Sequence, residues 1–366
     1  MIIRNGLVFQ EDGSFRKMDL FIENHRLVAS EEEVTDRTEI DAEGLKVIPG
    51  LVDIHSHGAY GHDFSDADAE GLKAVLRYEK SCGITSYCPT SMTLPLEELE
   101  KIFATAHEAG DSSDQARIVG INMEGPFLDP AKKGAHVEGY IRKPTGEFFD
   151  ACQKAAKGLI KLVTLAPNVE GAEEFIRDYH DKVEISLGHT AADYTCAKEA
   201  MDNGALHITH LYNAMQPLSH RDPGMIGAAI DHKDCVAELI CDGIHIHPSV
   251  VRATFQLFAG RVALVSDSMM ATGMENGTYQ LGGQEVTVKD CKATLANGTI
   301  AGSATNLFDC MRKAVSFGIP QSEAILAATA TPAKSIGIYD QVGSIAVGKE
   351  ADLLLVTDDL ELKQVI

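Results

Sequence analysis

The chain has 366 residues, and its 32 lysines and arginines against 54 aspartates and glutamates give a formal net charge of −22. This length corresponds to about two domains or to one α/β barrel with an addition, and a content of 45% hydrophobic and 23% charged residues excludes extensive disorder. The acidic balance disfavours nucleic acid as the main partner, because an acidic surface repels phosphate backbones.

Targeting signals and cysteine pairs are not evident in the sequence. No apolar run reaches the roughly 18 residues of a membrane-spanning helix. Arg4, Asn5 and Gly6 interrupt the N-terminal stretch where a secretory signal needs an apolar core, which predicts a cytoplasmic protein. The eight cysteines are scattered without a Cys-x-x-Cys pair, which indicates reduced thiols rather than a disulfide framework or a cysteine-based zinc site.

The two ends of the chain have the same β-rich character. Residues 1–48 contain short apolar runs divided by turn signals at Asn5-Gly6 and Asp12-Gly13. Near the other end, a turn at Gly348-Lys349 precedes a β-rich run from Ala351 to Thr357. We therefore expect a small β-sandwich domain formed by both termini, residues 1–48 plus 334–366.

The middle of the chain, residues 49–333, alternates short apolar runs with helical periodicity. Pro95 precedes one amphipathic helix, Thr190 is expected to cap a helix over Asp193–Asn203 that stops at Gly204, and Pro248 opens another. The candidate strands are Val47–Ile54, Ile84–Cys88, Arg117–Ile121, Leu159–Leu165, Val183–Leu187, Ala205–Thr209, Cys235–Ile240 and Val262–Val265. Eight strands, each followed by a helix or a long loop, predict an α/β fold, a catalytic (β/α)8 TIM-like barrel of roughly 250 residues.

Polar residues gather at the ends of these strands, where the active sites of such barrels lie. His55 and His57 are two residues apart, so they face the same way on a strand. The rim of the barrel would bring together His55, His57, Glu124, His189, His210, His245 and Asp267. A lone histidine after a strand is more often a hydrogen-bonded loop residue, but this repeated placement predicts a site for a divalent metal, which imidazole and carboxylate suit.

Such a site predicts metal-dependent hydrolysis of an amide, an ester or a ring C–N bond. A divalent cation lowers the pKa of its bound water toward ~7, and Asp267 could take the proton and pass it to a leaving group. The alternative for Asp267 is a helix cap or a buried ion-pair acid. Histidines outside the pattern, His25, His107, His180 and His232, are expected to be solvated, while His62 and His220 stay undecided.

At these residues the sequence resembles the amidohydrolase superfamily and, within it, the N-acetylglucosamine-6-phosphate deacetylases. The segment 47–58, VIPGLVDIHSHG, is similar to the first-strand signature of the superfamily, and 343–353 is similar to its returning β segment. Motifs that are more specific to the deacetylases are MEGPF at 123–127, KKGAH at 132–136, GHT at 188–190, THLYNAM at 209–215, CDGIH at 241–245 and LVSD at 264–267.

The resemblance implies a role for each matching residue. Glu124, His189 and His210 would hold the main metal, and Asp267 would act as the base and then as the acid that protonates the departing amine. His136 would contact the substrate and help to polarise the acetyl carbonyl. The other substrate-binding residues would be Ala135, Asn213, Ala214, Arg221, Asp242, His245, Ile300, Ala301 and Gly302.

The resemblance also implies an assembly and a metal content. The arginine that matches Arg221 reaches into the neighbouring subunit's site, which implies a homodimer. His55 and His57 are replaced in some members, and their presence here allows a second metal bridged by Glu124, so one or two ions per subunit are expected. Zinc is the expected metal, with Fe²⁺, Mn²⁺ and Co²⁺ as alternatives that suit the same ligands. Asn122 stands where many members have histidine, which changes the hydrogen bonding around the ligands.

The expected reaction converts N-acetyl-D-glucosamine-6-phosphate to D-glucosamine-6-phosphate and acetate, in amino-sugar catabolism or recycling. One alternative is the N-acetylgalactosamine epimer, since no motif reads the orientation of a single hydroxyl, and another is an amidohydrolase that acts on a different amide. An alternative of another class is a non-catalytic metal- or sugar-binding protein. A scaffolding protein, in contrast, would hold no metal.

Overall fold

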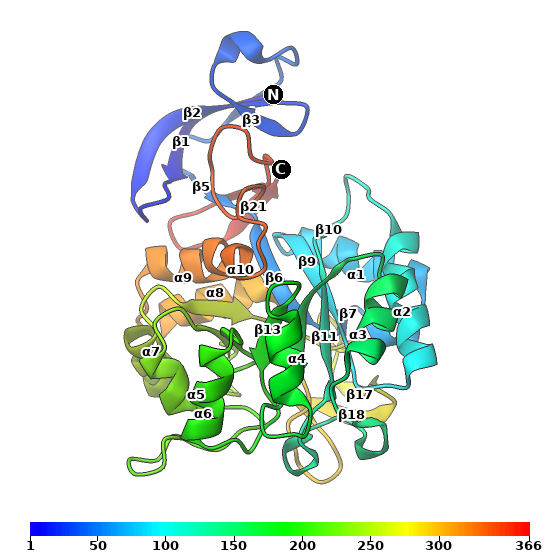
Figure 1. Cartoon of the computed structure of the whole chain (residues 1–366). Helices are drawn as coiled ribbons and strands as arrows, with labels where there is room; N and C mark the ends of the chain where they lie inside the picture. Colours follow the sequence, from blue (N-terminus) through cyan, green and yellow to red (C-terminus); the bar gives the residue numbers. More distant parts are fainter.

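Parallel strands form the central barrel of the computed structural model, which describes residues 1–366. In order of pairing they are β6 (Leu51–Ser56), β9 (Ile84–Ser91), β11 (Ile121–Phe127), β12 (Ile160–Leu165), β13 (Glu184–Leu187), β14 (His207–Ile208), β15 (Val236–Ile240) and β16 (Val262–Val265). The short β10 (Arg117–Ile118) pairs with β9 just before the chain continues as β11. The predicted (β/α)8 barrel is confirmed (Figure 1).

The barrel closes where β16 meets β6, and this seam carries part of the site. Residues 56 and 268 form an isolated parallel bridge, and their hydroxyl oxygens lie 2.6 Å apart. The backbone N–H of Asp267 donates to the carbonyl of His55 over 2.9 Å, and that of His57 donates to the carbonyl of Ser268 over 2.8 Å. Closure of the barrel therefore places two predicted ligands directly beside the predicted base.

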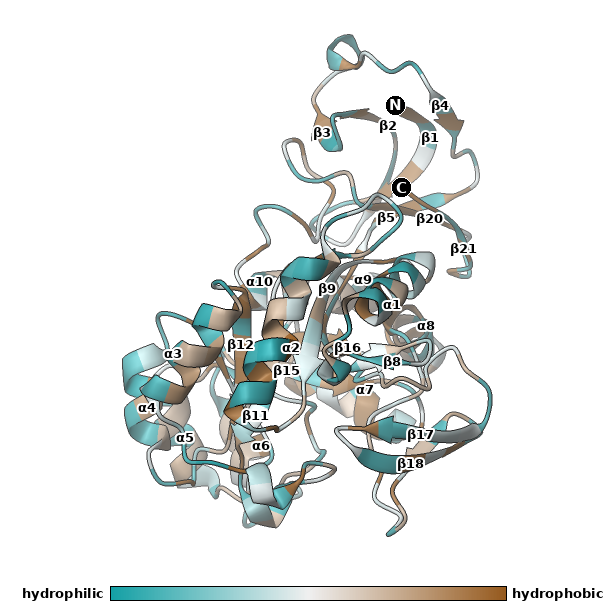
Figure 2. Ribbon diagram, turned by 90° about the vertical axis from the view of Figure 1, so that its right-hand side faces the viewer, coloured by the Kyte–Doolittle hydropathy of each residue, from teal (hydrophilic) through white to brown (hydrophobic).

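Ten α-helices surround the strands, and Figure 2 shows their polar faces outward and the apolar strands at the centre. They are α1 (Ala69–Ser81), α2 (Leu96–Ala109), α3 (Gly146–Ala155), α4 (Ala172–Tyr179), α5 (Tyr194–Asp202), α6 (Gly224–Asp231), α7 (Pro248–Leu257), α8 (Leu307–Ser316), α9 (Gln321–Ala328) and α10 (Ala330–Ser335). None of them is both long and apolar enough to cross a bilayer.

Helix ends follow local chemistry, with one correction. Pro248 is the first residue of α7, as predicted. The expected cap of α5 by Thr190 is wrong, because the carboxylate of Asp193 accepts the N–H of Cys196 and caps this helix instead. The Thr190 hydroxyl instead donates to Asn168 over 2.6 Å and so fixes the loop after β13.

Both termini contribute to a separate seven-stranded sheet at one end of the molecule (Figure 1). Its order is β21 (Leu362–Val365), β20 (Leu353–Val356), β5 (Lys46–Pro49), β1 (Ile2–Phe9), β2 (Phe15–Glu23) and β3 (Arg26–Val28), with β4 (Glu39–Asp41) also beside β1. Ten buried apolar residues form a core of its own. The exact division of the chain at residues 48 and 334 stays a prediction.

The predicted first strand, Val47–Ile54, is wrong as one strand. It breaks at Gly50 into β5 of the terminal sheet and β6 of the barrel. A Cβ at Gly50 would lie 2.1 Å from the Thr85 hydroxyl oxygen, so the chain passes the second barrel strand too closely for any side chain. The break explains how one apolar run serves two sheets.

An insertion between β16 and α8 lies at the opposite end from the terminal sheet (Figure 1). It contains the antiparallel strands β17 (Gly277–Leu281), β18 (Gln284–Lys289) and β19 (Lys292–Thr294). Leu281 and Val286 of the insertion pack with Met92, which follows β9. The sequence pattern does not predict this sheet, because its strands are short and only partly apolar.

Candidate active site

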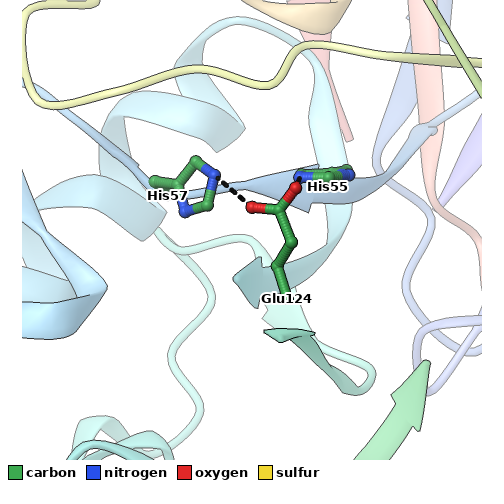
Figure 3. Close-up of side chains that lie close together, drawn as sticks. All are labelled: His55, His57 and Glu124. Carbon is green, nitrogen blue, oxygen red and sulfur yellow. Dashed lines mark ion pairs between the residues drawn. The ribbon is translucent and has the colours of Figure 1, made fainter. Parts of the chain in front are cut away.

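Glu124, in the middle of β11, lies at the centre of a group of buried histidines. Figure 3 shows its carboxylate between the imidazole of His55, in β6, and that of His57, which follows β6. The Nε2 atom of His57 lies 3.2 Å from Glu124 Oε2, and that of His55 lies 3.6 Å from Oε1. Because side chains two residues apart on a strand point to the same side, His55 and His57 both reach a single carboxylate.

Two further histidines approach the same carboxylate from the far side of the barrel. His189, after β13, and His210, after β14, place Nε2 atoms 3.1 Å and 2.9 Å from Glu124 Oε1. Their two Nε2 atoms are only 3.0 Å apart. Glu124 therefore lies between two histidine pairs, one from each side.

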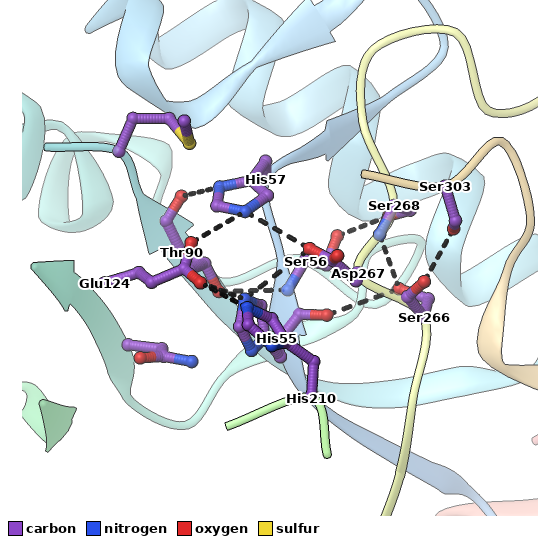
Figure 4. Close-up of polar contacts among 12 residues, drawn as sticks. His55, Ser56, His57, Thr90, Glu124, His210, Ser266, Asp267, Ser268 and Ser303 are labelled. Atoms are coloured by element: carbon purple, nitrogen blue, oxygen red, sulfur yellow. Dashed lines mark hydrogen bonds and ion pairs between the residues drawn. The ribbon is translucent and has the colours of Figure 1, made fainter. Parts of the chain in front are cut away.

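Asp267, which follows β16, completes this group. Its Oδ1 atom lies 3.3 Å from His57 Nε2 and 3.5 Å from His55 Nε2 (Figure 4). Its carboxylate therefore faces the pair of histidines that belongs to the first strand.

The residues present fit a divalent metal. The Nε2 atoms of His189 and His210 lie too close together for both to carry a proton between them, so at least one lone pair points toward the other ring. His55 Nε2 is buried without any hydrogen-bond partner, although it points toward two carboxylates. A cation would satisfy all of these groups, and neutral imidazole with carboxylate is a donor set for Zn²⁺ and similar ions.

Hydrogen bonds on the other side of each ring fix which nitrogen faces the centre. The Nδ1–H groups of His57 and His189 donate to the carbonyls of Thr90 (3.1 Å) and Lys132 (2.9 Å). A proton at Nδ1 leaves the lone pair of Nε2 free for a metal. The sequence pattern predicts His57 and His189 as ligands but not the carbonyl groups that orient them.

His136 is arranged in the opposite way. Its Nδ1 accepts the backbone N–H of Thr93 over 3.2 Å, which places the proton of the neutral ring on Nε2. That Nε2–H points toward Glu124 Oε2 at 3.4 Å. His136 is therefore arranged as a hydrogen-bond donor rather than as a metal ligand.

The pKa values reflect this concentration of charge. Burial lowers the pKa of His57, but hydrogen bonds to Asp267 and Glu124 outweigh it and raise the pKa to about 10. Burial lowers the pKa of His189 to about 4. Burial raises the pKa of Asp267, but the hydrogen bond to His57 and the nearby histidine charges bring it below its ordinary value. In the absence of a cation, the protons held by His55 and His57 therefore offset the negative charge of the nearby carboxylates.

Three of these residues have left-handed backbone conformations. The φ angles are 47° at His189, 26° at His210 and 47° at Asp267. Each residue follows a strand closely, so the local change of direction turns its side chain toward the barrel axis. Such conformations are unfavourable for most residues with a Cβ, and three of them occur together at this site.

A cavity of about 300 Å³ opens above the group. Its lining includes, from the predicted residues, His57, Glu124, Ala135, His136, His189, His210, Asn213, Ala214, His245, Asp267, Ile300, Ala301 and Gly302. Met92, Leu281 and Thr299 also line it and were not predicted. Leu281 belongs to the unpredicted insertion, so no sequence signal near the motifs points to it.

Three predicted site residues lie outside the cavity lining. His55 lies in the buried group beneath it, and Asp242 lies behind His245, whose Nδ1–H it accepts over 2.7 Å. Arg221 is exposed in the loop before α6 and does not reach the cavity of its own chain.

The Asn122 amide donates to the carbonyl of Ile54 over 3.0 Å and links β11 to β6.

The remaining histidines correct one expectation. His25 and His180 are exposed as expected, but the solvated interpretation is wrong for His107, which is half-buried and bonds the Ala156 carbonyl over 2.8 Å. It is wrong for His232 too, whose Nδ1 is buried without a partner. Of the undecided pair, His62 is half-buried and His220 is exposed. His207, which no prediction covers, is buried beside the Ser186 hydroxyl at 3.0 Å.

Comparison with known proteins supports a common origin for this arrangement. The model of the amidohydrolase family matches residues 46–366. An N-acetylglucosamine-6-phosphate deacetylase of Bacillus subtilis (strain 168) is 40% identical over 323 residues, which is 86% of this chain and 82% of the relative. An N-acetylgalactosamine-6-phosphate deacetylase of Escherichia coli O157:H7 is 32% identical over 370 residues, which is 100% of this chain and 97% of the relative.

A solved structure shows the same fold with a ligand. A variant of the N-acetyl-D-glucosamine-6-phosphate deacetylase of Mycobacterium smegmatis, in complex with N-acetyl-D-glucosamine-6-phosphate, superimposes with a TM-score of 0.91 and 30% sequence identity. The match covers 100% of this chain and 97% of that one.

Proposed function

Since this chain belongs to the amidohydrolase family, we propose that it removes the acetyl group from N-acetylglucosamine-6-phosphate and releases glucosamine-6-phosphate and acetate. The observation that carries this function is the group formed by Glu124, four histidines and Asp267 beneath a cavity of sugar size. Relatives with this activity over most of the chain support the choice of substrate.

Glu124, His189 and His210 would hold the main metal ion, and His55 with His57 would hold a second ion shared through Glu124. A divalent cation bound there supplies a polarised acetyl carbonyl and a water whose pKa approaches ~7. Zinc is the ion that we propose, because imidazole nitrogen and carboxylate oxygen are its usual ligands.

Asp267 would move the proton. Its lowered pKa keeps the carboxylate ionised near neutral pH, ready to take a proton from the attacking water. The water oxygen joins the acetyl carbon, the C–N bond breaks, and Asp267 returns the proton to the amine nitrogen. His136, with its proton on Nε2, would donate to the acetyl oxygen as negative charge develops there.

The sugar phosphate would lie between Asn213, Ala214 and His245 on one side and the 300–302 segment on the other. Asp242 would orient His245 through its hydrogen bond. Arg221 is exposed, so it would serve the cavity of a second copy in a homodimer, where its planar fork suits a phosphate. The cytoplasm is the compartment that we propose, which the eight unpaired cysteines support.

Amine release from N-acetylglucosamine-6-phosphate by the zinc-loaded protein tests this function. We expect turnover of this substrate to exceed that of its unphosphorylated form, because the phosphate contributes binding. Absence of turnover in protein that holds metal would contradict the proposed substrate.

The galactosamine epimer is the second candidate substrate. The Escherichia coli relative that is named for this substrate matches the whole of this chain, which favours the galactosamine epimer as an alternative. Measuring both epimers in the same assay decides between them, because they differ only in the orientation of one hydroxyl group. We expect the glucosamine epimer to give the larger kcat/KM.

A further inference from the structure

One buried acid of the barrel has no place in the mechanism above. Glu238 is the single charged residue of β15, whose sequence VAELI is otherwise apolar, and it is fully buried. It lies beneath the metal-binding group, inside the barrel. The acidic residue in an apolar strand is a signal that sequence reasoning could have used.

The polar contacts of the Glu238 carboxylate are all with histidine residues. Its Oε2 accepts the Nδ1–H of His55 over 2.8 Å and also the backbone N–H of His210 over 3.0 Å. Its Oε1 lies 3.8 Å from His207 Nδ1 and has no hydrogen-bond partner. No lysine or arginine forms an ion pair with it. A buried carboxylate without a basic partner is unfavourable unless a nearby group carries compensating positive charge.

His55 differs from the other ligands in what holds it. His57 and His189 are oriented by neutral backbone carbonyls, whereas His55 is oriented by a full negative charge. A carboxylate at Nδ1 raises the electron density at Nε2 and strengthens the bond that this nitrogen makes to a metal. That Nε2 is the atom that is buried without a partner, 3.6 Å from Glu124 and 3.5 Å from Asp267.

We propose that Glu238 is a positioning residue that makes His55 a metal ligand and thereby sets the affinity of the second ion, the one shared by His55, His57 and Glu124. This inference rests on the proposed two-ion centre. The ion supplies the positive charge that the buried carboxylate lacks, while the carboxylate fixes the tautomer and direction of the ring.

The test uses the full-length protein and zinc itself. Wild type, Glu238→Gln and Glu79→Gln are dialysed against zinc buffered by chelators, and bound zinc per subunit is measured by elemental analysis. Gln keeps the shape and an acceptor oxygen, so it removes the charge without opening a cavity. Glu79 on α1 is a matched control, since it is also fully buried but has no hydrogen-bond partner.

We expect Glu238→Gln to bind the second zinc ten- to a hundredfold more weakly while the first zinc changes less than threefold. Glu79→Gln should bind both ions as wild type does. His55→Gln should lose the second ion, and adding Glu238→Gln to it should weaken zinc binding no further, because the carboxylate acts through His55. A purely structural role predicts additive effects in the double variant.

Three results would overturn the inference: unchanged affinity for both ions in Glu238→Gln, equal weakening of both ions, or additive effects with His55→Gln. A wild-type protein that deacetylates with a single bound ion would also overturn it and would leave the proposed function intact. Selective loss of the second zinc in a protein that lacks deacetylase activity would instead support the inference and contradict the proposed function.

Discussion

Asp267 lines the cavity and lies beside the imidazole of His57. Because it is not one of the proposed ligands of the main ion, its effect on catalysis can be separated from binding of that ion. Asp267→Asn keeps the size of the side chain but removes the ability to take a proton. We expect kcat to fall by about 10²–10⁴-fold, with zinc retained at Glu124, His189 and His210. Steady-state kinetics with zinc analysis checks this, and near-wild-type turnover would remove Asp267 from its role.

His57 gives a second prediction at the same scale, about protons rather than rate. Its pKa of about 10 in the metal-free protein means that its ring is protonated at neutral pH. A metal binds the neutral ring, so binding must release this proton, and the affinity must rise with pH up to about 10. Calorimetric titration of metal-free protein in buffers of different ionisation enthalpy measures the released protons. Binding heats that do not depend on the buffer would contradict the prediction.

Among the elements, the hairpin of β7 (Gly58–Ala59) and β8 (His62–Asp63) directly follows His57, a proposed metal ligand. A Cβ at Gly58 would lie 2.1 Å from the His62 carbonyl oxygen, a backbone atom that cannot rotate away. Gly58→Ala should therefore lower the free energy of unfolding by about 1–3 kcal/mol and lower kcat/KM by displacing His57. Gly139→Ala, where no atom lies within 4 Å of the new Cβ, is the control. Equal melting temperatures for the two variants would be the contrary result.

Some secondary-structure elements could be predicted from the sequence and others could not. Apolar runs between turn signals locate the barrel strands because parallel strands are buried on both faces. The break at Gly50 is not predictable from that pattern, since it depends on the Thr85 side chain of another strand. The insertion β17–β19 is not predictable for a similar reason, because Leu281 is buried in a cluster that includes Met92, which follows the distant strand β9. Local patterns thus identify elements, whereas close approaches between distant elements arise only in the folded chain.

The candidate site also has residues that the sequence predicts and groups that it does not. The residues that touch the centre stand in recognisable motifs at strand ends, so His55, Glu124 and Asp267 could be predicted. The groups that orient them could not, because the carbonyl of Thr90 looks like any other backbone group in a sequence. Glu238 lies between these cases, since its acidic side chain is visible in the sequence but its hydrogen-bond partners come from β6 and from the segment after β14.

At the scale of the whole molecule, the proposed homodimer would place Arg221 of one copy at the cavity of the other. Arg221 is exposed and outside the cavity of its own chain. If Arg221 completes the partner's site, two inactive variants should restore activity when they are combined in one dimer. Arg221→Ala and Asp267→Asn should each be nearly inactive toward the phosphorylated substrate. Dimers re-formed from an equal mixture should recover about a quarter of wild-type activity, because half of the dimers are mixed and each has one intact site. Activity equal to the average of the two variants would place Arg221 outside a shared site.

The left-handed conformations of His189, His210 and Asp267 have an evolutionary consequence. Each lowers the stability of the fold by an amount of the order of 1 kcal/mol that glycine would avoid. A lineage released from selection for hydrolysis would therefore gain robustness by drifting to glycine at these three positions. Two histidines and an aspartate at these positions are therefore what we expect of a lineage under selection for hydrolysis.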